Sequence, residues 1–197
     1  MKVAFGMRAH SGWAALVVVG IRDGDFAVVD RRRIELVEDA WAKQPYHAAE
    51  EMEAGAARAL VERGIEAAQR IAIREMRAAV RREQARQNKV TACAVLVANP
   101  MPDWSVEEIL AVHFRMHQAE GVLFREALAG AATACGLRLL RVPEKQLDQY
   151  AEQALATSLN SLRKTIASLG KSVGPPWGKD QKDAALAAMI ALQGGPK

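Results

Sequence analysis

A continuous apolar run at residues 90–98 constrains the fold of this 197-residue chain more than any other segment. The run reads Val-Thr-Ala-Cys-Ala-Val-Leu-Val-Ala and stops at Asn99-Pro100. A strand with this pattern is typical of a sheet that is buried on both faces, where helices cover parallel neighbours. The run therefore predicts an α/β fold with a central, covered strand.

The segments around this run predict the element order βββ, α, β, α, β, α. Residues 3–7, 14–21 and 26–29 form three strands, the third prolonged by residues 31–37, and Asp23-Gly24 is a strong hairpin signal before the third. Helices are expected at residues 46–88 (one long or two stacked), 105–135, 144–155, 159–169 and 179–192, and a fifth strand at 137–142. The order predicts a single domain over residues 1–197. Its mixed five-stranded sheet would have three antiparallel and then two parallel strands, with helices on both faces.

Composition narrows the classes of function. A net charge of +4 and a pI near 9.3 permit contact with phosphates without requiring it. Cys93 and Cys135 have no metal-ligand spacing, so we expect reduced thiols in the cytoplasm. The apolar run at residues 13–21 is too short to span a bilayer and no other approaches the needed length, so we expect no membrane partner.

A pair of carboxylates marks the start of the last, alanine-rich helix. Asp180 and Asp183 stand one turn apart, and the face of Asp183 continues through apolar residues toward the body of the protein. A carboxylate placed there needs a partner, which can be a divalent metal, an arginine or the first-turn amides of the helix. In the simplest alternative Asp180 is the N-cap and Asp183 the third helical residue, an arrangement worth about 0.5–2 kcal/mol with no chemistry.

Two short motifs, together with the element order, resemble the RuvC-type branch of ribonuclease H-like proteins, which includes Holliday-junction resolvases. Residues 4–12, Ala-Phe-Gly-Met-Arg-Ala-His-Ser-Gly, have the shape of the family's first strand and turn, and Asp180-Gln-Lys-Asp183-Ala that of its last helix. The resemblance implies a ribonuclease H-like fold over nearly the whole chain. It also implies nucleic acid as a partner, Asp180 and Asp183 as ligands of Mg or Mn, and metal-dependent phosphodiester hydrolysis.

Two positions depart from that family pattern. Arg8 stands where the first strand of the family carries an aspartate, and Asn99 stands where the fourth strand ends in an acid. A cation in place of the central carboxylate removes a bridging ligand and repels the two metals. The alternative to a metal-dependent enzyme is therefore a relative without the chemistry, in which Arg8 pairs with Asp183.

Histidines offer further candidate sites. His10 in the first turn is suited to phosphate binding or general base chemistry, although histidine is also an ordinary turn residue. His113, His117 and Glu120 recur at i, i+4 and i+7, so they can meet one metal or simply form a polar helix face. A small-molecule hydrolase that uses His10, His117 and Glu120 is a third possible class of function.

A basic ridge is expected on the long helical region. Arg70, Arg74, Arg77 and Arg81 share one face, opposite a narrow seam formed by Ala68, Ala72, Met76 and Ala79. The ridge predicts a surface for nucleic acid or an acidic partner, or else a solvated face paired with glutamates. Because the seam can pack against a second copy, the sequence leaves open a non-catalytic dimeric scaffold or interaction module.

Overall fold

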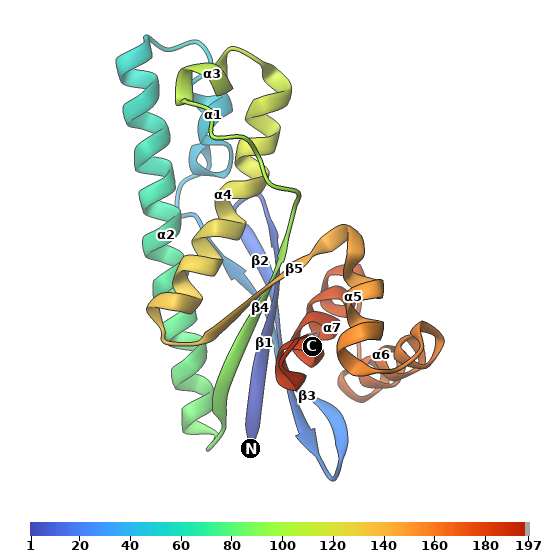
Figure 1. Ribbon diagram of the computed structural model, residues 1–197. Coiled ribbons are helices and arrows are strands. Elements are labelled where there is room, and N and C mark those ends of the chain that lie inside the picture. Colours follow the sequence, from blue (N-terminus) through green and yellow to red (C-terminus); the bar gives the residue numbers. More distant parts are fainter. Residues whose placement is uncertain (196–197) are drawn as a thin grey trace.

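The computed structural model describes residues 1–195 and is built on one mixed sheet with strand order β3-β2-β1-β4-β5 (Figure 1). β1 pairs antiparallel with β2 and parallel with β4, β2 pairs antiparallel with β3, and β4 pairs parallel with β5. This topology confirms the predicted mixed five-stranded sheet. The strands are β1 (Lys2–His10), β2 (Trp13–Arg22), β3 (Asp25–Glu35), β4 (Lys89–Val97) and β5 (Arg138–Pro143).

The helical regions expected at residues 46–88 and 105–135 are each interrupted at a point where the sequence has no glycine or proline. The first divides at residues 49–53, and the second divides at Val112, whose backbone is extended. None of the helices in residues 1–195 has the length and apolarity needed to cross a membrane. The helices are α1 (Pro45–Ala48), α2 (Ala54–Ala85), α3 (Val106–Leu110), α4 (His113–Ala134), α5 (Leu147–Leu155), α6 (Leu159–Val173) and α7 (Lys179–Gln193). Short 3-10 turns cover Trp41–Lys43 and Glu144–Gln146.

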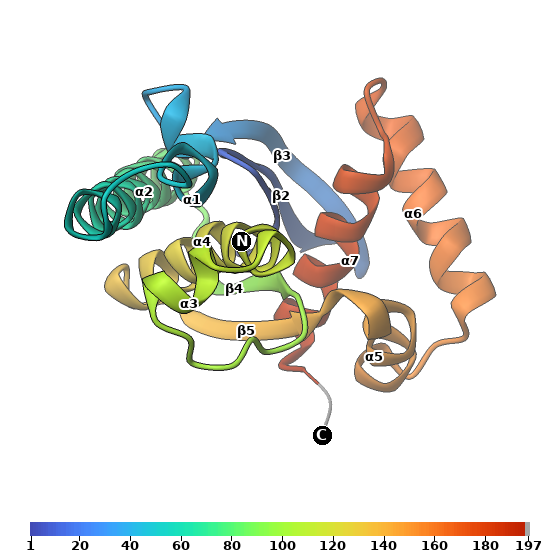
Figure 2. The ribbon, with the colours of Figure 1, turned by 90° about the horizontal axis from the view of Figure 1, so that it is seen from above.

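Helices cover both faces of the sheet, as the view from above shows (Figure 2). α2 and α4 pack on one face, and α5, α6 and α7 pack on the other. Successive side chains of a strand point to opposite faces. Accordingly, Phe5 and Met7 of β1 contribute to the core beneath α2 and α4, whereas Ala4 contributes to the core beneath α7.

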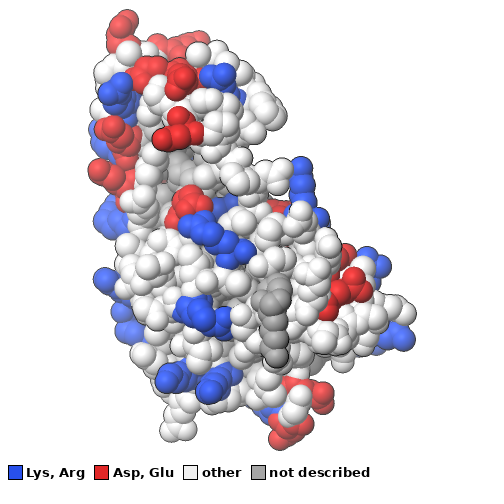
Figure 3. All heavy atoms as spheres, viewed as in Figure 1, with Lys and Arg blue, Asp and Glu red and all other residues white. Residues whose placement is uncertain are grey.

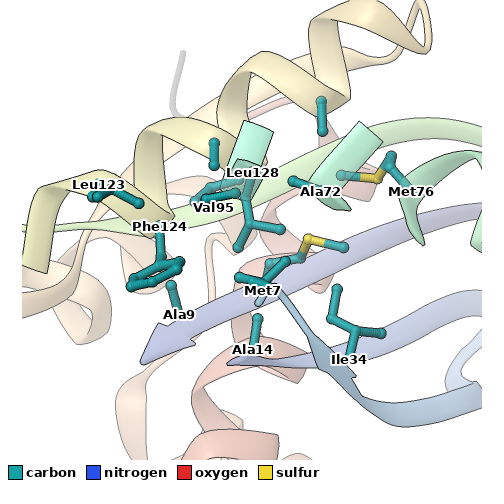
Figure 4. Close-up of a cluster of buried hydrophobic side chains, with 14 of the residues drawn as sticks. Met7, Ala9, Ala14, Ile34, Ala72, Met76, Val95, Leu123, Phe124 and Leu128 are labelled. Atoms are coloured by element: carbon teal, nitrogen blue, oxygen red, sulfur yellow. The ribbon is translucent and has the colours of Figure 1, made fainter. Parts of the chain in front are cut away.

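The core between the sheet and α4 is built from large, fully buried side chains (Figure 4). Met7 from β1 and Val95 from β4 pack with Phe124 and Leu128 from α4, and none of them is more than 1% exposed. Burial of each such side chain contributes about 1.5–3 kcal/mol. β4 is buried from residue 92 through 96, which confirms that the apolar run forms an interior strand covered on both faces.

The alanine-rich seam of α2 belongs to this same core. Ala68, Ala72, Met76 and Ala79 are all buried within the chain. The prediction that this seam packs a second copy is therefore wrong, because the protein's own core already covers it.

α7 approaches β1 closely because Gly6 has no side chain. A Cβ atom at Gly6 would lie only 1.8 Å from the carbonyl oxygen of Ala184. The alanines of α7 are fully buried and keep the helix surface thin where it meets the sheet. This close packing holds the first turns of α7 beside the carboxyl end of β1.

Candidate functional site

Arg8 lies near the carboxyl end of β1 and binds three carboxylates at once. Its Nη1 donates to Asp183, and its Nη2 donates to Glu144 Oε1 at 2.7 Å. Its Nε is 3.2 Å from Asp180 Oδ1. The Arg8 side chain is 13% exposed, so these contacts lie largely out of water. The pairing of Arg8 with Asp183, expected as the alternative to a metal site, is present.

The three acids reach Arg8 from the segment that follows β5 and from the start of α7. Glu144 directly follows β5, which runs parallel to β4, as β4 does to β1. Asp180 and Asp183 lie in the first turns of α7. The N-cap of α7 is Gly178 rather than Asp180, and the Gly178 amide donates to Gln181 Oε1 at 2.9 Å. Asp180 is therefore already inside the helix, and both aspartates face Arg8.

Further cations complete the charge balance of this cluster. Arg125 Nη2 of α4 donates to Glu144 Oε2 at 3.0 Å, and Lys179 pairs with Asp183. The three carboxylates therefore face three permanent cations. A site with this balance lacks the surplus negative charge that holds divalent ions.

His10 lies at the edge of the same cluster. Its Nε2 is 3.0 Å from Asp180 Oδ1, although the alignment gives no hydrogen bond. The imidazole stacks on the Trp13 ring, with ring centroids 4.3 Å apart. The structure therefore brings together Arg8, His10, Asp180 and Asp183, whose proposed chemical roles stay predictions.

The donor set around Arg8 does not fit a pair of metal ions. The guanidinium stands among the carboxylates that would have to bridge the metals. Asn99 lines a neighbouring cavity of about 510 Å³ together with Arg125, Glu144 and Lys179. Asn99 therefore supplies a neutral amide at the position where the RuvC-type pattern has a carboxylate.

His117 and Glu120 lie apart from His10, in a cluster that the sequence showed only in part. His47 of α1 joins His113 and His117 of α4 there. Glu120 is buried and accepts a hydrogen bond from His47, so it stands behind the imidazoles instead of beside them as a ligand. Burial and the charge of Glu120 raise the pKa of the adjacent Tyr46. Sequence reasoning missed His47 and, in the Arg8 cluster, Glu144 and Arg125.

The basic ridge lies along the exposed side of α2 and is partly neutralised. Arg74 donates to Glu38 at 2.7 Å and lowers the pKa of that carboxyl, and Arg70 is 4.0 Å from the same residue. Arg77 and Arg81 form no ion pair with any acid in the part of the chain that the structure describes. Figure 3 shows blue atoms along the lower part of the edge that α2 forms, whereas red and blue atoms mix over its upper part.

Comparisons with known proteins support the fold. A Thermus thermophilus RuvC structure matches with a TM-score of 0.50 and 15% identity over 97% of this chain and 93% of that chain. T. thermophilus RuvC in complex with a Holliday junction substrate matches with a TM-score of 0.53 and 12% identity, covering 98% and 94%. No family model and no curated protein matches the sequence. At these identities the likeness concerns the fold, and the chain has a ribonuclease H-like fold of the RuvC type.

Proposed function

We propose that this protein binds nucleic acid and does not cut it by two-metal catalysis. The observation that carries the proposal is the position of Arg8, which holds Asp180, Asp183 and Glu144 on its three guanidinium nitrogens. A metal ion entering this cluster has to displace a guanidinium from three partners and then lie beside its positive charge. Both effects oppose the clamp of shared carboxylates that two-metal phosphodiester hydrolysis uses.

The basic ridge of α2 is the surface that we assign to the nucleic-acid backbone. Arg77 and Arg81 are free of acidic partners among residues 1–195, and together with Arg70 and Arg74 they line a shallow depression. Arginines spaced along a helix suit contacts with successive phosphates, which supply most of the affinity of non-specific binding. The RuvC structure with a Holliday junction substrate shows that a chain of similar fold accepts branched DNA.

Binding can be tested by the salt dependence of affinity for a fluorescent four-way junction and for duplexes of the same arms. Replacing Arg77 and Arg81 together with glutamine should weaken binding to all of them. It should also flatten the plot of log K against log salt by about 0.9 for each phosphate that the protein no longer neutralises. Arg58→Gln is the matched control, because Arg58 lies on the same helix but donates to Glu107 at 3.0 Å. An unchanged slope in the double variant would show that the ridge does not contact the phosphates.

Cleavage can be tested on the same substrates with Mn²⁺ or Mg²⁺. The wild-type protein should leave them intact. Arg8→Asp places a carboxylate where the RuvC-type pattern has one and removes the competing cation, so this variant should gain affinity for Mn²⁺ by calorimetry. Metal-dependent cleavage by the wild-type protein that Asp183→Asn abolishes would refute the proposal and establish a nuclease.

The Arg8 cluster also favours a second candidate, a non-catalytic scaffold. Because the alanine seam of α2 is buried, a dimer of this kind has to use another surface. Sedimentation that shows a dimer, combined with no nucleic-acid binding at low salt, would select the scaffold over the nucleic-acid-binding protein.

A further inference from the structure

Three of the four histidines of the chain meet at a second cluster of ionisable side chains, beside α1 and the start of α4. His47 comes from α1, and His113 and His117 come from the first two turns of α4. One ring nitrogen from each lies within 4.8 Å of the others. The ring centroids are 4.6–5.1 Å apart in every pair, so the three imidazoles surround a common point.

A buried glutamate fixes the orientation of His47. His47 Nδ1 is 2.9 Å from both carboxylate oxygens of Glu120, and the His47 main-chain amide donates to Oε1 at 3.2 Å. Glu120 is 3% exposed. A carboxylate at Nδ1 places the imidazole proton on that nitrogen and leaves the lone pair on Nε2. His47 Nε2 is itself buried and has no hydrogen-bond partner among residues 1–195.

The spacing of the other two imidazoles suits coordination to a small ion. His113 Nε2 and His117 Nε2 are 3.2 Å apart. Two nitrogens bound tetrahedrally to zinc at about 2.05 Å are separated by roughly 3.3 Å. His113 Nδ1 is 3.8 Å from Glu50 Oε1, so a second carboxylate lies on the outer side of the cluster. A carboxylate beside the remaining nitrogen is common for metal-binding histidines, and His47 and His113 each have one here.

We propose that His47, His113 and His117 bind one zinc ion and that Glu120 positions His47 for it. Neutral imidazoles are good ligands for zinc, whereas magnesium and manganese prefer oxygen. Three protein nitrogens leave a fourth tetrahedral position for water or an anion. His113 is 64% exposed, so that position is open to solvent. His117 also lines the cavity beside Arg125 and Glu144, but no hydrogen bond or ion pair among residues 1–195 joins the three histidines to Arg8 or its carboxylates. The proposed zinc site does not depend on nucleic-acid binding.

The packing of α1 explains how His47 reaches this point. Pro45 of α1 lies against Gly64 of α2, where a Cβ atom would be 2.8 Å from Pro45 Cβ. Gly64 therefore lets α1 sit close to the long helix, with His47 directed toward α4. A bound zinc ion would join α1 to α4.

The simplest competing explanation is a cluster of packed aromatic rings with no ion. His113 and His117 are both exposed, so removal of their rings from water contributes little free energy to holding them together. Ring packing also leaves His47 Nε2 without a partner in the described part of the chain. A buried polar atom without a partner lowers the stability of the protein, because it has lost its hydrogen bonds to water. A zinc ion satisfies that nitrogen.

Calorimetric titration of the full chain, after removal of metals with EDTA, tests the site directly. The wild-type protein should bind one Zn²⁺ per chain, and Co²⁺ in the same site should give the visible absorption of tetrahedral coordination. His117→Gln should weaken zinc binding at least 100-fold, and Glu120→Gln should weaken it about 10–100-fold by releasing the orientation of His47. His10→Gln is the matched control, because His10 is the one histidine outside the cluster, and it should bind zinc as the wild type does.

The variants separate a binding defect from a folding defect. His113 and His117 are exposed, so circular dichroism of His113→Gln and His117→Gln should match the wild type even if His47→Gln fails to fold. Zinc binding that His117→Gln leaves intact, or that His10→Gln removes, would overturn the proposal. Absence of binding by the wild-type protein would do the same, without bearing on the nucleic-acid surface of α2.

Discussion

Replacing Arg8 with methionine removes the central cation of the strand-end cluster and keeps most of the side-chain volume. The change eliminates two hydrogen bonds, to Asp183 and Glu144, and one ion pair, to Asp180. Breaking a fully buried pair costs about 3–5 kcal/mol, whereas an exposed pair contributes about 0–1 kcal/mol. The Arg8 side chain is 13% exposed and its partners 17–28%. We therefore expect Arg8→Met to lower the free energy of unfolding by about 3 kcal/mol.

The same variant should respond to divalent ions, unlike the wild type. Without Arg8, three carboxylates face only Arg125 and Lys179 as permanent cations. The surplus negative charge should attract Mn²⁺, and an ion present at about 100 times its dissociation constant adds about 2.7 kcal/mol of stability. Urea titrations of both proteins, with and without Mn²⁺, measure these changes. A destabilisation below about 1 kcal/mol, or equal stabilisation of both proteins by Mn²⁺, would refute the argument.

A second substitution checks that the effect arises from pairing. Asp183→Asn alone should cost about 1–2 kcal/mol, because Glu144 and Asp180 still hold Arg8. In the Arg8→Met background the same change removes one of three mutually repelling charges, so its cost should fall to near zero or change sign. Additive effects in the double variant would show that Arg8 and Asp183 are not coupled.

Three other substitutions or modifications test the packing. Gly6→Ala places a methyl group against the Ala184 carbonyl and should cost about 3 kcal/mol or more in urea unfolding, and a neutral effect would contradict the close contact of α7 with β1. Burial raises the pKa of Cys93 to about 12, so a thiol reagent at pH 8 should modify only the half-buried Cys135, and equal rates for both thiols would argue against this core. Gly64→Ala should displace α1, so it should lower the affinity for zinc while the free energy of unfolding changes little. Unchanged zinc affinity would show that the position of α1 does not determine the geometry of the histidine site.

Local signals in the sequence determine much of the fold. Asp23 and Gly24 both have positive φ angles, 53° and 91°, which is the conformation that a two-residue hairpin turn requires. The apolar run at residues 90–98 likewise corresponds to a strand with neighbours on both sides. In contrast, the end of α3 before Val112 has no glycine or proline to mark it, so the sequence predicts one continuous helix where the structure has two.

The sites are predictable only where their residues share a local motif. Asp180 and Asp183 stand out because they lie one turn apart, but Glu144 reaches Arg8 across 136 residues. The sequence indicates a role for Glu144 only through its position directly after a strand that runs parallel to its neighbour. Parallel strands end at the same edge of a sheet, where sites commonly form. His47 gives no signal of this kind, since a four-residue helix brings it to Glu120 across 73 residues.

The position of α7 has a consequence for how the protein is made. Of all the elements in residues 1–195, α7 is translated last, yet it packs on β1, the first strand and the centre of the sheet. Until α7 leaves the ribosome, one face of β1 and β2 stays open to solvent and Arg8 lacks two of its three carboxylates. A nascent chain that stops before Lys179 therefore exposes an apolar surface with an unmatched positive charge, a combination suited to capture by a chaperone.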